Sequence, residues 1–254
     1  MNKITIIGSG SVGSTIAYTA TVMGLASEIV MIDINEEKAL GEALDIRQGI
    51  PFCNPATVHA GSYQDAVDSD IVIITSGLPR KPGQTRLDLA QANVNIMKSI
   101  ATEIVKYAPK ATYVIVSNPV DILTYVFCKT TGIPEKRVIG SGTILDTSRL
   151  RARIAEYYSV NQKNVHAYIL GEHGDSSLVP WDHSYVGCKK ITDIMKDNNH
   201  PMEDLKKIHD GVWQAAYEII EKKKATYYGI GMALNRLIKA ILNFVTFLGM
   251  LFNS

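Results

Sequence analysis

Hydrophobic and polar positions change period repeatedly along the first half of the chain. Short β-branched or apolar runs predict buried strands, and between them apolar residues recur three or four positions apart, as on a helix. Strands alternating with helices predict an α/β fold with a doubly wound parallel sheet, which binds ligands at the carboxyl ends of its strands. The strand-like runs lie at 4–7, 28–32, 57–60, 71–75 and 113–117, and the helix-like stretches include 14–23 and 88–107.

The pattern changes near Gly140. A helical stretch over 142–158 is followed by an apolar run at 165–170, which predicts a buried strand. The chain is then less regular until Asn199, and two helices are predicted at the end of the sequence. We therefore expect a first domain over 1–140 and a second, α+β region over 141–254. The two final helices are predicted over 201–224 and 226–242.

Composition narrows the class of protein. The 254 residues are 46% hydrophobic and 20% charged, with a formal net charge of +1, which suits globular domains with a sizeable core. This balance gives no electrostatic reason to expect nucleic acid or a membrane as partner. Cys53, Cys128 and Cys188 have no metal-like spacing, so no metal site is expected. No targeting segment precedes the first strand, which favours reduced thiols in the cytoplasm.

A glycine-rich turn joins the first strand to the first helix, with the sequence GSGSVG over 8–13. Gly8 permits a tight turn, Gly10 lets a pyrophosphate approach the helix N-terminus, and Gly13 allows close packing of helix on strand. Asp33 follows 20 residues after Gly13, at the end of the second strand. A carboxylate there accepts hydrogen bonds from ribose hydroxyls and repels a 2′-phosphate, which favours NAD over NADP. The alternative is a structural turn with no ligand.

Two further residues fall just past predicted strand ends, at the edge where a cofactor would bind. They are Gly77 and Asn118. Asn118 precedes Pro119, a turn signal, and the next helix is predicted to begin near Val120. Asn118 could therefore cap that helix or contact a cofactor, and the sequence leaves both interpretations open.

His173 lies between two glycines, in the sequence LGEHGDS over 170–176. The predicted strand and turn put this imidazole at a strand end, where it could act as a general acid or base. The alternative is a turn whose histidine faces water. Upstream, Asp146 and Arg149 are three residues apart and share a helix face, for which a surface salt bridge is the default interpretation.

Several motifs in one order carry a family resemblance. From Met1 to about Asn243 the chain resembles the L-lactate dehydrogenase and lactate-dehydrogenase-like malate dehydrogenase family. The resemblance implies a Rossmann-type NAD-binding domain followed by an α+β substrate domain. The motifs are GSGSVG, Asp33, RKPGQTR (80–86), SNPVD (117–121), GTILDTSRLR (142–151), LGEHGDS and ATYYGIG (225–231).

The resemblance also implies residue roles. His173 would give the proton when a 2-keto acid is reduced, and Asp146 would orient and stabilise its imidazole. Arg149 would bind the substrate carboxylate, and Arg86 would polarise the ketone from a lid over 78–86. Substrate contacts are implied for Arg80, Arg86, Asn118, Arg149 and Thr226. Cofactor contacts are implied for Gly8, Gly10, Val12, Gly13, Asp33, Gly77, Asn118 and Ser141.

Two observations disagree about the substrate. The chain has Arg80 where lactate enzymes of this family usually have glutamine, and malate enzymes have arginine there. Glu172 and Thr226 resemble the lactate branch. A cation facing the methyl group of pyruvate would have no partner. We expect an L-lactate dehydrogenase, and malate or mixed specificity is the alternative.

Arg151 and His166 match positions at which bacterial lactate dehydrogenases bind fructose 1,6-bisphosphate between subunits. The resemblance thus implies an allosteric, homotetrameric oxidoreductase of glycolysis and fermentation. The alternative is that Arg151 lies on a solvated helix face and His166 is an ordinary strand residue.

The last eleven residues, FVTFLGMLFNS, match nothing in the family, which continues for further strands and a helix. We interpret them as a truncated or frame-shifted end that leaves the substrate domain incomplete. On that interpretation, assembly and activity are in doubt, and an inactive nucleotide-binding remnant is the alternative. The apolar tail is shorter than the about 20 residues of a transmembrane helix.

Overall fold

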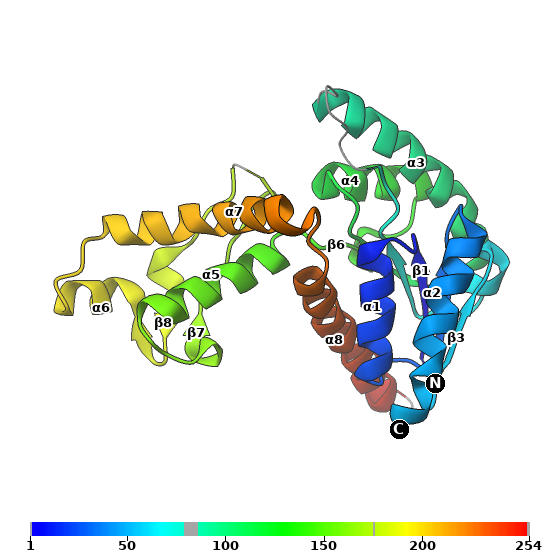
Figure 1. The fold of residues 1–254 in the computed structure, drawn as a ribbon, viewed down its shortest axis with the longest axis horizontal. Helices are drawn as coiled ribbons and strands as arrows, with labels where there is room; N and C mark the ends of the chain where they lie inside the picture. The colour runs from blue at the N-terminus through cyan, green and yellow to red at the C-terminus, as the bar shows by residue number, and fades with distance from the viewer. Residues whose placement is uncertain (1, 79–85, 175, 253–254) are drawn as a thin grey trace. The chain divides into compact units, whose positions relative to one another are not determined.

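The computed structural model describes residues 2–78, 86–174 and 176–252, with the backbone alone at 86 and 244–252 (Figure 1). The chain forms two compact units. The first comprises Met1–Ser141 together with Tyr227–Ser254, and the second comprises Gly142–Thr226.

A six-stranded parallel sheet forms the centre of the first unit. Its strand order is β3-β2-β1-β4-β5-β6, so the direction of winding reverses between β1 and β4. In sheets of this kind ligands bind at the carboxyl ends of the strands beside that switch point. The predicted doubly wound parallel sheet is confirmed. The strands are β1 (Lys3–Ile7), β2 (Glu28–Ile32), β3 (Thr57–Ala60), β4 (Ile71–Ile74), β5 (Thr112–Ile115) and β6 (Val138–Gly140).

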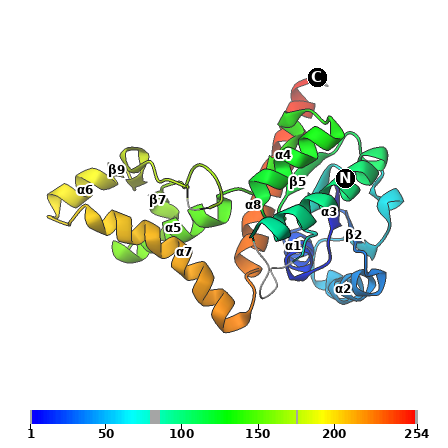
Figure 2. The same cartoon turned by 90° about the horizontal axis from the view of Figure 1, so that it is seen from above.

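Helices cover both faces of this sheet, which is why its strands are apolar on both sides. Ile4 and Ile6 of β1 face a core shared with α1, α2 and α8, whereas Ile7 faces a core shared with α3 and α4. Helices α3 and α4 lie side by side in both views (Figure 2). The helices are α1 (Ser11–Val22), α2 (Glu36–Gln48), α3 (Arg86–Tyr107), α4 (Val120–Thr131) and α8 (Tyr228–Phe252).

Helix α8 packs on α1 of the sheet unit, although the sequence analysis assigns it to the region 141–254. The cause is its apolar stripe, in which Leu234, Ile238 and Leu242 recur every fourth residue and join the core of Ile16. The buried Asn235 amide donates to the Ile16 carbonyl oxygen, at 3.3 Å. Among the residues that the structure describes, no helix, α8 included, is long and apolar enough to cross a membrane.

In the second unit α5 packs against α7 and against β7 of a small antiparallel sheet of order β7-β8-β9. Its core brings Leu150 and Ile154 of α5 together with Leu205 and Val212 of α7. The elements are α5 (Ile144–Tyr157), β7 (Val165–His166), β8 (Tyr185–Val186), β9 (Lys189–Lys190), α6 (Ile191–Asp197) and α7 (Glu203–Lys223). Short 3₁₀ turns lie at Ile50–Phe52, Tyr63–Ala66, Glu135–Arg137, Gln162–Asn164 and Trp181–His183.

Candidate active site

Hydrogen bonds join the loops that follow β1, β4 and β5 at the carboxyl edge of the sheet. The Thr75 hydroxyl donates to the Gly8 carbonyl at 2.8 Å, and the Ser117 hydroxyl donates to the Ser76 carbonyl at 2.5 Å. Each loop thereby fixes its neighbour. The edge at the switch point is therefore a preformed structure and suits a ligand that must be held in one position.

A residue that the sequence analysis missed completes this network. The Asn93 side chain, 3% exposed in α3, accepts from the Leu78 backbone N–H at 2.8 Å and donates to the Asn118 carbonyl at 2.8 Å. It thus connects the loop after β4 to the loop after β5. Its signal in the sequence is its position: Asn93 is four residues before Met97 on the buried stripe of the helix, where a polar side chain needs a partner.

The glycine-rich turn has the geometry that each glycine predicts. Gly8 has φ +106°, a conformation that side chains other than hydrogen rarely adopt. A Cβ on Gly13 would lie 1.8 Å from the Gly8 carbonyl oxygen, so only glycine lets α1 start this close to the turn. A Cβ on Gly10 would meet nothing within 4 Å. The space over Gly10 is where a pyrophosphate could approach the N-terminus of α1, so the turn fits a dinucleotide.

Asp33 directly follows β2 and its carboxylate faces the same turn. Oδ2 accepts from the Ser9 backbone N–H at 2.6 Å, and Oδ1 accepts from the Asn35 N–H at 2.9 Å. A carboxylate has about four lone-pair sites, so these two bonds fix its orientation and leave capacity for ribose hydroxyls.

The other residues proposed for the cofactor also lie at or near this edge. Gly77 follows β4, and Ser141, 9% exposed, follows β6. Val12, in the first turn of α1, packs partly buried against the core. Asn118 does not cap α4, because Pro119 is the N-cap residue of that helix and no side chain there makes a cap hydrogen bond. The capping interpretation is therefore wrong.

Three predicted catalytic residues meet in the second unit. Asp146, in the first turn of α5, is fully buried, and its Oδ2 lies 2.6 Å from Nδ1 of His173. Its Oδ1 accepts from Arg149 Nη1 at 3.1 Å. The Asp146–Arg149 pair is thus not the surface salt bridge that its spacing alone suggests. A buried carboxylate between an arginine and a histidine fixes the imidazole tautomer and favours the imidazolium.

The segment that leads to His173 is extended, but the prediction of a strand over 165–170 is wrong beyond β7. Leu170 forms an isolated antiparallel bridge with Leu178. At Ala167 and Ile169 the backbone is instead bound by three side chains of α5 and its N-cap residue, spaced four residues apart. The hydroxyl of Thr143 donates to the Ile169 carbonyl at 2.6 Å, and the Ile169 N–H donates to the Thr147 hydroxyl at 3.0 Å. Arg151 Nε donates to the Ala167 carbonyl at 2.9 Å. We call these contacts the α5 ladder. It holds the segment against the helix that carries Asp146.

The remaining predicted residues belong to different elements of the chain. Arg86 is the first residue of α3, whereas Arg80 lies outside the described residues. Thr226 is half-buried at the end of the second unit. His166 is exposed in β7, and the Arg151 guanidinium lies 4.6 Å from the centre of the Tyr168 ring.

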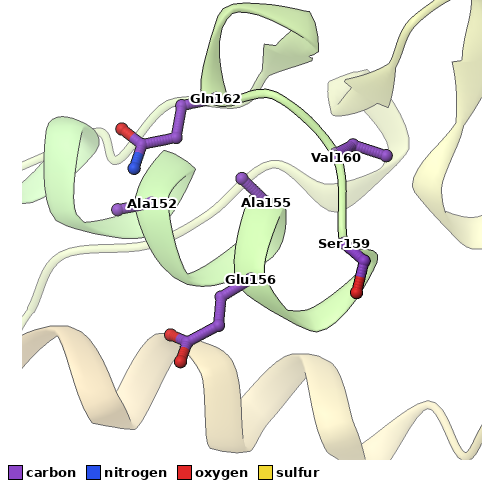
Figure 3. A pocket seen from close by; sticks show the side chains of 6 residues that line it. All are labelled: Ala152, Ala155, Glu156, Ser159, Val160 and Gln162. Carbon is purple, nitrogen blue, oxygen red and sulfur yellow. The ribbon is translucent and has the colours of Figure 1, made fainter.

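A hollow of ≈ 520 Å³ near the end of α5 is a separate feature (Figure 3). None of the predicted catalytic, substrate or cofactor residues lines it, and Glu156 is its one ionisable side chain. One exposed carboxylate provides no acid–base pair, so this hollow is not the catalytic centre. Its lining residues are Ala152, Ala155, Glu156, Ser159, Val160 and Gln162.

Comparison with known families assigns the two parts of the chain to two family models. Residues 2–140 match the model of the lactate/malate dehydrogenase NAD binding domain, and residues 143–249 match that of the alpha/beta C-terminal domain. The chain belongs to the lactate/malate dehydrogenase family. As a member of this family it is an NAD-dependent oxidoreductase.

Similar proteins come from several bacteria. L-lactate dehydrogenase 2 of Bacillus cereus and L-lactate dehydrogenase 1 of Bacillus anthracis are each 49% identical over 245 residues, which are 96% of this chain and 78% of each relative. The ligand-bound crystal structure of the minor L-lactate dehydrogenase of Enterococcus mundtii has a TM-score of 0.92 and 46% identity. That match covers 95% of this chain and 77% of the other.

Proposed function

We propose that this family member is an L-lactate dehydrogenase that reduces pyruvate to L-lactate with NADH. The observation that carries the proposal is the buried contact of Asp146 with the His173 imidazole, in a chain whose other unit has the dinucleotide-binding turn. The names of the similar proteins support the same substrate.

In the proposed reaction each residue has one task. Asp146 holds Nδ1 of His173, so proton transfer to the substrate oxygen is assigned to Nε2. The charge that develops on the imidazole is stabilised by the same carboxylate. Arg149 binds the substrate carboxylate with its planar fork, and Arg86 polarises the ketone. Asp33, Gly10 and the loop residue Asn118 would hold NADH, which when bound would supply the hydride.

Substrate preference depends on Arg80, and we expect Arg80→Gln to change it. A guanidinium can neutralise the second carboxylate of oxaloacetate and an amide cannot, so kcat/KM for oxaloacetate should fall about tenfold or more. The value for pyruvate should stay or rise. The assay is NADH oxidation by the purified chain and the variant with each keto acid. If the folded protein binds NADH but oxidises it with neither keto acid, the proposed function is wrong. If the ratio of kcat/KM for oxaloacetate to kcat/KM for pyruvate is the same in Arg80→Gln, Arg80 does not determine the preference.

NAD selectivity is the second expectation. NADH should bind more tightly than NADPH, because the Asp33 carboxylate repels a 2′-phosphate and bonds the ribose hydroxyls. Titration of both cofactors by their fluorescence measures this difference. Asp33→Asn is the matched variant, since an amide keeps an acceptor for the Ser9 N–H and removes the charge. Asp33→Asn should reduce the difference in affinity between NADH and NADPH. Equal affinities for the two cofactors in the unaltered chain would refute the role of Asp33 in selecting NAD.

We further propose a cytoplasmic, homotetrameric enzyme of fermentative glycolysis, activated by fructose 1,6-bisphosphate at Arg151 and His166. The support is the resemblance of these positions to the bacterial effector site, together with the exposure of His166 beside the extended segment that Arg151 holds. A protonated imidazole and a guanidinium suit a phosphate, so binding should be tighter at lower pH.

The test is the dependence of rate on pyruvate, with and without the bisphosphate, at pH 6 and pH 8. We expect the apparent KM to fall with effector, more at pH 6 than at pH 8. Arg151→Gln should abolish the shift, and Lys163→Gln, at an exposed lysine of the same unit, should keep it. A protein that is tetrameric by sedimentation and shows no shift at either pH would exclude this site.

A further inference from the structure

The indole of Trp213 lies against the imidazole of His173. The two ring centres are 6.1 Å apart and the rings are inclined by 46°. Trp213 is half-buried in α7, and 27% of the His173 side chain is exposed. The imidazole therefore has the Asp146 carboxylate at Nδ1 and an aromatic ring beside it, and these two groups come from different helices.

We propose that Trp213 is a positioning residue for His173, an inference that rests on the proposed function. The hydrogen bond at Nδ1 fixes the position of that nitrogen but not, by itself, the tilt of the ring about the axis of the bond. A large aromatic side chain packed beside the ring restricts this tilt and so keeps Nε2 in one direction. Offset and tilted ring pairs at this separation are favourable, and an indole also attracts a cation, so the contact persists when the imidazole is protonated.

Other ionisable groups near the two rings could also change with pH, and their influence must be distinguished from that of the Trp213–His173 contact. Asp146 and Arg149 approach from α5, and Glu172 precedes His173 in its loop. On α7, His209 is one helical turn before Trp213, and Asp210 directly follows His209 in the sequence. His209 is the group whose protonation could most readily affect Trp213 in place of His173, because it shares a helix face with Trp213 and its Nε2 is buried.

Steady-state kinetics give the first test. Trp213→Leu keeps an apolar side chain but removes the aromatic ring, and it should lower kcat for pyruvate about three- to tenfold. KM should stay the same, because Arg149 and Arg86 bind the substrate. Trp213→Phe keeps an aromatic ring and should restore most of the rate. A purely structural role would instead lower the thermal stability of both variants with no change in kcat of the folded fraction.

Fluorescence gives a test that needs no turnover. The chain has two tryptophans, so Trp181→Phe leaves Trp213 as the only indole. Indole emission responds to a charge placed against the ring, so the emission should titrate with the protonation of His173. Adding His173→Asn should make it independent of pH between 5 and 9, whereas adding His209→Asn, the matched control, should leave the titration in place.

The outcomes separate this proposal from the proposed function. An emission titration that needs His173, in a protein inactive on every keto acid, would support the contact and refute the function. Emission that titrates through His209 alone, or does not titrate at all, would overturn the positioning role even in an active enzyme. Equal kcat values in the unaltered chain and Trp213→Leu would overturn it as well.

Discussion

Replacing His173 with alanine is expected to lower kcat for pyruvate by about 10²–10⁴-fold, the usual contribution of a general acid. The physical reason is the loss of the imidazole that Asp146 orients for proton transfer. The buried carboxylate would keep Arg149 as a partner, so the second unit should still fold. NADH binding should persist, because the residues proposed to hold the cofactor belong to the other unit.

The measurement combines steady-state NADH oxidation with pyruvate and NADH titration, both over pH 5–9. Asp146→Asn is the companion variant: an amide cannot stabilise the imidazolium, so it too should slow turnover and alter the pH profile. Turnover that persists in His173→Ala with an unchanged pH profile would show that another group is the acid.

Gly13→Ala should be the most destabilising single methyl that can be added to the cofactor turn. Its Cβ would lie 1.8 Å from a backbone oxygen, and neither the strand nor the helix can move away without disturbing the sheet. We expect the free energy of unfolding to fall by about 3 kcal/mol or more, the upper end of overpacking effects. Urea unfolding followed by circular dichroism measures the loss.

Gly10→Ala is its matched control. Nothing lies within 4 Å of the added methyl, and Gly10 has φ −75°, which alanine adopts. Stability should therefore change by less than about 1 kcal/mol, while NADH affinity falls about tenfold or more because the methyl occupies the space assigned to the pyrophosphate. If both variants unfold alike and bind NADH alike, the two glycines do not have the separate roles proposed here.

Local patterns were sufficient to predict the sheet and its cofactor turn. Each strand is a continuous apolar run because helices cover both faces, and the roles of Gly8 and Gly13 follow from backbone sterics within a few residues. The predicted helix starts were late by three residues at Ser11 and by two at Arg86, where polar residues begin the first turn.

Long-range partners could not be predicted. The extended segment before His173 has the apolar alternation of a strand. Yet the backbone of Ala167 and Ile169 is bound by threonine and arginine side chains of α5 and its N-cap residue, about twenty residues away in the sequence. The sequence around Asn93 predicts an ordinary helix residue, and its role is evident only from its hydrogen bonds with the loops after β4 and β5. In each case a side chain bonds the backbone of a residue far away in the sequence, and such a contact leaves no periodic pattern of hydrophobic and polar residues from which it could be predicted.

The α5 ladder gives Arg151 two tasks that cannot be varied independently. Its Nε donates to the carbonyl of Ala167, six residues before His173, and its guanidinium is also the group proposed to bind an effector phosphate. A bound anion that turns the guanidinium would loosen the tether on the chain leading to His173, and one that leaves it in place would tighten it. The affinity for the effector is then linked to how firmly the imidazole is held. Thermodynamic reciprocity requires that, if the effector changes the affinity for a substrate bound beside His173, the substrate changes the affinity for the effector by the same factor.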